Sequence, residues 1–326
     1  MANTDQRLYG IDLARSIAIL GVVLVHCGLF ENGRFGVQLF FLVSGFLLAD
    51  LGKLSGRDFL IRRGFRLFPL YWIILILFYR NDFDSFWQLF ISLTLIQSTH
   101  WIFTSTPGAW SISNEWIFSL LLPIIRRITR KKIFIIILFS WLGQLLSSFL
   151  VWRWGGVTSS EGETQYALYI WVNTLNPFIN VSFFLIGIGL KKTFIPILKN
   201  RLIAFTIIIA SQLSSLFLGL DMLFLWPPVL WAIFSLCIGW TPRSKITKYF
   251  VRFIGKRTYG IFFIHFIILA YLTEISWIQE LSENLRLQQW TLFAITFITS
   301  AVFADFCWRF IENPSIKISR RFIRNQ

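Results

Sequence analysis

The chain has 326 residues, of which 56% are hydrophobic and only 14% charged, and its formal net charge is +15. Soluble proteins carry about 25% charged residues, so this composition excludes a water-soluble globule and indicates a protein with several membrane spans. The positive charge does not indicate a nucleic-acid partner, because Lys and Arg form short clusters between apolar runs, as in cytoplasmic loops.

Ten apolar runs predict ten transmembrane helices in a single membrane domain that covers residues 1–326. They lie near 11–30, 36–52, 67–80, 108–125, 133–151, 167–190, 202–220, 223–240, 258–278 and 290–311. The stretch near 83–97 is expected to be re-entrant or interfacial. With that choice nearly all basic residues fall on one side, which places both termini in the cytoplasm. We therefore expect an all-α integral membrane protein, multi-pass in the cell (inner or plasma) membrane.

Besides Asp12 at its start, the first run carries two ionisable side chains that a lipid-facing span has no reason to keep, Arg15 and His26. Their spacing places them about 20° apart around a helix and about 16 Å apart along it. Arg15 is expected near the cytoplasmic mouth and His26 near the external face. An imidazole there could take a proton from a hydroxyl. Alternatively, Arg15 is a positive-inside anchor and His26 only hydrogen-bonds a neighbouring helix.

A cluster of arginines follows the second span and comprises Arg62, Arg63 and Arg66. Guanidinium groups pair bidentately with phosphate, so the cluster could bind the phosphates of a nucleotide-like donor at the membrane mouth. Anionic lipid headgroups are the alternative ligand. Pro69, just beyond the cluster, is expected to break or begin a helix.

Glu115 is an acid in the middle of a predicted span, at nearly the expected depth of His26. A carboxylate beside an imidazole would fix its tautomer and stabilise the imidazolium. Alternatively, Glu115 only holds helices together through Arg or Trp. The candidate substrate-binding side chains are Trp110, Ser113, Asn114 and Ser44. A Ser-Gly pair such as Ser44 with its neighbour is also typical of close helix packing.

His265 lies about a turn and a half into its predicted span from the cytoplasmic side, far from the expected depth of His26. There it either lines the donor channel or packs. His100 falls in a predicted external loop and is not expected to be catalytic. Histidines at three depths form no ligand set, so no metal is expected. The cysteines lie inside apolar runs and suggest no disulfide framework.

Together these segments resemble the acyltransferase family 3 membrane proteins, which include bacterial O-acetyltransferases of surface polysaccharides. The resemblance covers nearly the whole chain and rests on IDLARSIAILGVVLVH, GVQLFFLVSGFLL, IRRGFRLFPLYW, WSISNEWIFSLLLP, TYGIFFIH and IENP. It implies transfer of an acyl group, usually acetyl from cytoplasmic acetyl-CoA, to a sugar hydroxyl across the membrane. By motif match, the resemblance implies that Arg15 and His26 are the essential pair, Arg62 and Arg66 donor-side residues, and Glu115 the acid of a W-x-x-x-x-E motif. Unlike in larger members, no C-terminal SGNH-type domain is expected.

The predicted function is therefore O-acyl transfer, with acetyl-CoA as co-substrate and a glycan or lipid-linked glycan, such as an O-antigen or lipopolysaccharide sugar, as acceptor. Membrane lipid is the other expected partner. His26, oriented by Glu115, is the expected general base, and an acetylated His26 is the less favoured alternative. The rival function is a transporter or flippase for a lipid-linked sugar, in which Arg15 and the arginine cluster escort a diphosphate. The acceptor, the acyl group and the oligomeric state are not predicted.

Overall fold

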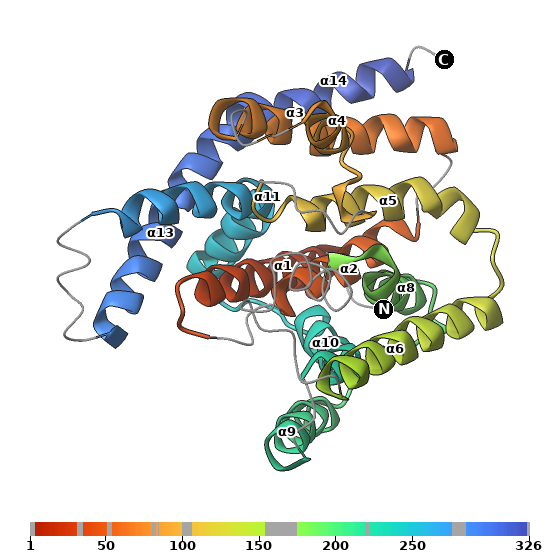
Figure 1. Ribbon diagram of the computed structural model, residues 1–326. Helices are drawn as coiled ribbons and strands as arrows, with labels where there is room; N and C mark the ends of the chain where they lie inside the picture. The colour runs from red at the N-terminus through yellow and green to blue at the C-terminus, as the bar shows by residue number, and fades with distance from the viewer. Residues whose placement is uncertain are drawn as a thin grey trace. The chain divides into compact units, whose positions relative to one another are not determined.

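The computed structural model describes residues 4–30, 35–50, 54–79, 83, 85–99, 106–153, 175–218, 222–275 and 285–324. Within these ranges the regular structure is helical and contains no strand, which confirms the all-α prediction. Every predicted span contains a helix (Figure 1), although residues 167–174 of one span and His100 lie outside the described residues. In chain order the elements are α1 (Thr4–His26), α2 (Phe35–Leu48), α3 (Gly56–Phe78), α4 (Phe86–Leu93), the 3-10 helix η2 (Gln97–Thr99), α5 (Ala109–Ile125), α6 (Arg130–Arg153), α8 (Pro177–Lys191), α9 (Arg201–Leu218), α10 (Met222–Ile238), α11 (Lys245–Thr273), α13 (Leu285–Cys307), the π-helix η6 (Trp308–Glu312) and α14 (Asn313–Arg324).

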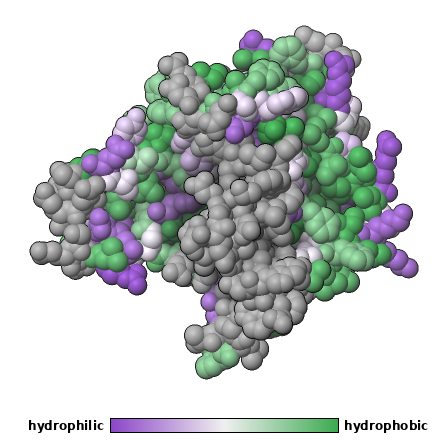
Figure 2. Space-filling view, in the orientation of Figure 1, coloured by the Kyte–Doolittle hydropathy of each residue, from purple (hydrophilic) through white to green (hydrophobic). Residues whose placement is uncertain are grey.

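Apolar side chains cover much of the described surface on the face shown in Figure 2. Among the described residues, three helical stretches are long and apolar enough to cross a membrane: Tyr9–His26, Lys245–Thr273 and Leu285–Ile323. Shorter apolar helices occur in α2, α5, α8, α9 and α10. This set of helices is typical of a membrane protein, whereas the ten crossings and the cytoplasmic termini stay predictions.

The segment predicted to be re-entrant or interfacial forms the eight-residue helix α4 and the short helix η2. Ser85 caps α4, where its hydroxyl accepts a hydrogen bond from the backbone N–H of Gln88. Eight residues rise about 12 Å, against a hydrocarbon core of about 30 Å. Helix α4 alone is therefore too short to cross.

Two helices begin well before the predicted spans. Helix α11 starts at Lys245 rather than near 258, behind an N-cap in which Ser244 accepts a hydrogen bond from the backbone N–H of Thr247. Helix α3 starts at Gly56 rather than near 67 and continues through Pro69. The prediction that Pro69 breaks or begins a helix is therefore wrong. Hydropathy marks only the apolar part of a helix, whereas Lys and Arg are themselves good helix formers, and packed membrane helices tolerate proline.

The described helices form two compact units. The first comprises residues 1–40, 64–78 and 236–326, and the second residues 41–63 and 79–235. Helices α2, α3 and α10 contribute to both units.

In the first unit, α1 and α11 run parallel. Near one end, a Cβ on Gly255 would lie 2.7 Å from the Cβ of Asp12, and toward the other end the rings of His26 and His265 approach each other. Helix α13 packs along α11, where a Cβ on Gly260 would lie 2.9 Å from the Cβ of Ala304. Small residues at both crossings let these helices approach closely.

In the second unit, α2 crosses α8 at two glycines. A Cβ on Gly45 would overlap the backbone carbonyl of Phe184, and one on Gly187 would overlap that of Leu42. The two backbones are therefore in contact. Because α2 and α8 are in contact at Gly45, the neighbouring residue Ser44 has a defined position relative to α8.

Candidate active site

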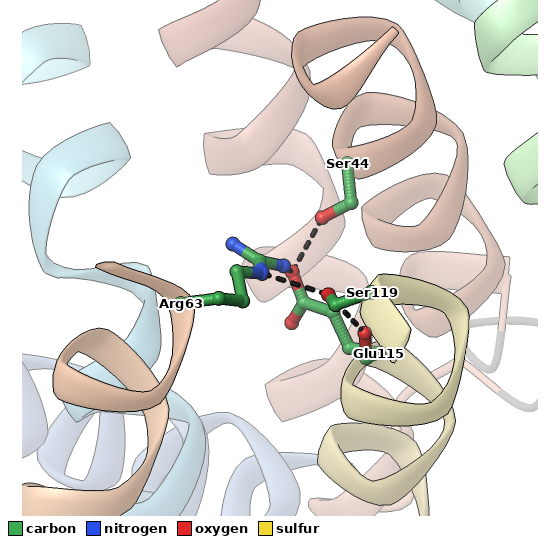
Figure 3. A network of polar contacts seen from close by, with 4 residues as sticks. All are labelled: Ser44, Arg63, Glu115 and Ser119. Atoms are coloured by element: carbon green, nitrogen blue, oxygen red, sulfur yellow. Dashed lines mark hydrogen bonds and ion pairs between the residues drawn. The ribbon is translucent and has the colours of Figure 1, made fainter. Parts of the chain in front are cut away.

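A buried ion pair in the second unit joins α3 to α5 (Figure 3). The Arg63 guanidinium donates to Glu115 Oε1, and their side chains are only 5% and 16% exposed. Ser44 of α2 donates to the same carboxylate oxygen at 2.5 Å. One oxygen of Glu115 thus accepts hydrogen bonds from two different helices. Buried charges are stable only when paired and hydrogen-bonded in this way.

Helix geometry completes this network through Ser119. Ser119 lies one turn beyond Glu115 on α5, and its hydroxyl donates to the Glu115 carbonyl at 2.7 Å. The same hydroxyl accepts a hydrogen bond from Arg63 Nε at 3.1 Å. Glu115 and Ser119 are four residues apart and so lie on the same face of a helix. This spacing is the sequence signal that could have predicted that both bind one guanidinium.

The three clustered arginines differ in their surroundings. Arg62 is exposed and Arg66 half-buried, whereas Arg63 is buried against Glu115. The guanidinium of Arg63 is thus already occupied by a carboxylate and a hydroxyl. Phosphate binding by Arg62 and Arg66 stays a prediction, and so does the pairing of Glu115 with His26, which lies in the other unit.

The predicted substrate-binding residues on α5 lie within the helix packing. Ser113 is fully buried, with its hydroxyl 2.7 Å from that of Ser98. Asn114 is also fully buried and donates from Nδ2 to the Leu175 carbonyl at 2.9 Å. Trp110 is half-buried, and its ring forms a T-shaped pair with that of Phe41. Substrate contact by these side chains stays a prediction.

In the first unit, His26 and His265 come together. His26 ends α1 and is exposed, whereas His265 is fully buried in α11, and their ring centroids are 5.3 Å apart. The prediction that His265 lies far from the depth of His26 is therefore wrong. The cause is the early start of α11, which places His265 well along the helix instead of near its beginning.

A second charged cluster in the first unit was not predicted. Arg257 of α11 donates from Nε to Asp305 Oδ1 of α13 at 2.6 Å, and Arg309 contacts Asp305 Oδ2 at 2.8 Å. Arg257 also lies 3.9 Å from the Phe253 ring centroid. The i,i+4 spacing of Asp305 and Arg309 was the available sequence signal. No group of three or more metal-ligating side chains occurs among the residues that the structure describes.

Most of the chain matches a known protein family. The acyltransferase 3 family, described as an acyltransferase domain, matches residues 8–309. The chain belongs to the acyltransferase 3 family. The resemblance inferred from the motifs is thereby confirmed, and the match runs from within α1 to just past the end of α13.

Curated relatives of this acyltransferase 3 chain come from Staphylococcus aureus. The proteins of strains COL, MSSA476 and MRSA252 each carry the name "Putative O-acetyltransferase" and are 24% identical over 358 residues. The alignment covers 94% of this chain but 56% of each relative, so the chain spans about half the length of the curated relatives it matches. No solved structure matches the chain.

Proposed function

We propose that this chain is a membrane O-acyltransferase. It would move an acetyl or other short acyl group from cytoplasmic acetyl-CoA to a sugar hydroxyl of a surface polysaccharide, or of its lipid-linked precursor, on the opposite side of the membrane. The observation that carries the proposal is the acyltransferase 3 family match over residues 8–309. The name of the staphylococcal relatives supports O-acetyl transfer in particular.

His26 is the proposed general base. It ends an apolar helix and is exposed, so a hydroxyl could approach its ring. The imidazole takes the hydroxyl proton while the hydroxyl oxygen attacks the thioester carbonyl carbon. The new C–O bond forms, the C–S bond breaks, and the proton passes to the departing thiolate of CoA. The acyl group is transferred without oxidation or reduction.

Arg15 is the proposed donor-side residue on the same helix. It precedes His26 by three helical turns, about 16 Å along the axis. That length suits a donor whose phosphates bind at one end and whose thioester is consumed at the other. Arg62 and Arg66 would add phosphate contacts, because neither is as deeply buried as Arg63.

Glu115 and Arg63 have a supporting role within the second unit in this proposal. Their pairing connects α3 and α5, and Ser44 connects α2 to the same carboxylate. A buried ion pair at this position would hold the helix that carries Arg62 in a fixed register.

The test is release of CoA by membranes that contain the protein, supplied with acetyl-CoA labelled on the acetyl group. We expect label to enter a glycan or lipid-linked glycan fraction and free CoA to appear in equal amount. His26→Ala should abolish both, while His100→Ala, in a predicted external loop, serves as the matched histidine control. Release of no CoA by the wild-type protein, together with movement of lipid-linked sugar across the membrane, would favour the transporter instead.

A further inference from the structure

We infer that His265 is the positioning residue for His26: when the exposed His26 ring turns toward it, His265 Nε2 accepts a hydrogen bond from that imidazole and fixes which nitrogen of His26 acts as the base. This inference rests on the proposed function, because it deepens the role given to His26. It concerns only the first unit, in which α1 and α11 run parallel and α1 ends with His26 beside His265 of α11.

The protonation of His265 follows from its backbone contact. Its Nδ1 lies 3.1 Å from the carbonyl oxygen of Ile261, one turn earlier on α11. A carbonyl oxygen only accepts, so Nδ1 must carry the proton of this contact. In the neutral ring Nε2 then bears the lone pair and can only accept. Helix α11 therefore presents a fixed acceptor at a defined point.

That acceptor has no donor within the part of the chain that the structure describes. His265 is fully buried, and its Nε2 makes no hydrogen bond. A buried acceptor without a donor is destabilising, whereas a phenylalanine would fill the same space without that cost. A histidine at this position therefore has a use for its outer nitrogen.

Among the described residues the structure shows no hydrogen bond to Nε2, but the neighbouring His26 ring carries an N–H that could reach it. The described rings that contact His265 are those of His26, Phe262 and Phe266, and only the first has an N–H. The two imidazole centroids are 5.3 Å apart. A ring nitrogen lies about 1 Å from its centroid, so a turn of the exposed His26 ring that brought one nitrogen to face Nε2 would place the two about 3 Å apart, which is hydrogen-bond distance. Phe266 packs against both imidazoles, at 4.6 Å and 4.0 Å between centroids, and limits their movement.

The hydrogen bond to His265 would decide which nitrogen of His26 acts as the base. If one nitrogen of His26 donates to His265 Nε2, the other nitrogen carries the lone pair and faces away from the buried side. The exposed face of His26 is then always the basic one. After His26 accepts the hydroxyl proton, the hydrogen bond persists and stabilises the imidazolium. A carboxylate has this role in a catalytic triad, and here a neutral imidazole would take it.

The test compares three substitutions of His265 that differ at the outer nitrogen. His265→Gln keeps an acceptor near the position of Nε2, His265→Asn keeps only a group near Nδ1, and His265→Phe keeps the ring without an acceptor. We expect the Asn and Phe variants to lower kcat of acetyl transfer by at least about tenfold, with KM for acetyl-CoA within about threefold of wild type. The Gln variant should recover kcat to within about fivefold.

A second measurement does not depend on acyl transfer. Diethyl pyrocarbonate modifies the basic nitrogen of exposed imidazoles, and mass spectrometry reports the rate at His26 alone. We expect that rate to fall in the Asn and Phe variants and to recover in the Gln variant. If the wild-type protein transferred no acetyl group, the proposed function would fail, and this rate would still decide whether His265 acts on His26.

Three results would overturn the inference. One is full kcat in His265→Phe, because no acceptor would then be needed. Another is a Gln variant that unfolds at the same temperature as wild type and yet is as slow as the Phe variant. The last is equal modification of His26 in all four proteins. If the Phe variant fails to fold, the comparison of Gln with Asn carries the test.

Discussion

Removing one partner of the buried Arg63–Glu115 pair should destabilise the second unit strongly. Glu115→Ala would leave the Arg63 guanidinium, only 5% exposed, with Ser119 as its remaining partner in this network. Leaving one member of a buried pair uncompensated costs about 3–5 kcal/mol. Glu115→Gln keeps an oxygen for Ser44 and Arg63 but loses the charge, so a smaller loss of about 1.5–3 kcal/mol is expected.

A double-mutant cycle separates this pairing from general disruption. The cycle uses Arg63→Met, Glu115→Gln and both together, with unfolding free energies measured in mixed micelles. Since the double variant buries no unpaired charge, its loss should be smaller than the sum of the single losses by at least about 2 kcal/mol.

The surface pair of Lys191 and Asp50 in the same unit is the control. Its charged atoms are 3.7 Å apart and its side chains are 23% and 68% exposed, so a coupling below about 1 kcal/mol is expected. Single losses at Arg63 and Glu115 that simply add, to within about 0.5 kcal/mol, would refute the reasoning.

Three further predictions test the packing and the donor side. Gly45→Ala should destabilise the α2–α8 crossing by about 1–3 kcal/mol, because its Cβ meets a backbone carbonyl. Gly64→Ala, whose Cβ would lie 3.7 Å from a Phe68 side-chain atom, should be neutral or stabilising; equal melting temperatures for the two variants would contradict this. Asp305→Asn should cost more than Arg309→Ala in thermal unfolding, since Arg257 is 12% exposed and Arg309 66%, and the reverse order would be inconsistent with the cluster. Arg15→Lys should raise KM for acetyl-CoA about tenfold without changing Tm, because an ammonium lacks the bidentate geometry; an unchanged KM would remove Arg15 from the donor site.

Hydropathy predicted where helices occur but not where they begin. Each apolar run contains a helix because burial in lipid or protein favours backbone groups that are satisfied internally. The charged beginnings of α3 and α11 were assigned to loops, since charges lower the mean hydropathy without breaking a helix. Helix α14, with four basic residues among its twelve, was missed for the same reason.

The error at α11 changed the interpretation of a candidate residue. A helix that began at residue 258 would have placed His265 near the cytoplasmic side, whereas the observed start at Lys245 places it beside His26.

The Arg63–Glu115 pair could not be predicted for another reason. Spacing along one helix is visible in a sequence, but which face of α3 meets α5 depends on packing between segments far apart in the chain. Of the expectations drawn from the sequence, the alternative in which Glu115 holds helices together through Arg or Trp came closest to this pair.

Transfer across the membrane is the central claim, and sealed vesicles of known protein orientation test it most directly. Labelled acetyl-CoA is enclosed on the side of Arg15, and purified surface polysaccharide is supplied only on the side of His26. The account predicts acetylated polysaccharide outside and free CoA inside, with neither product in His26→Ala vesicles. Acetylation only when donor and acceptor share one compartment would contradict it.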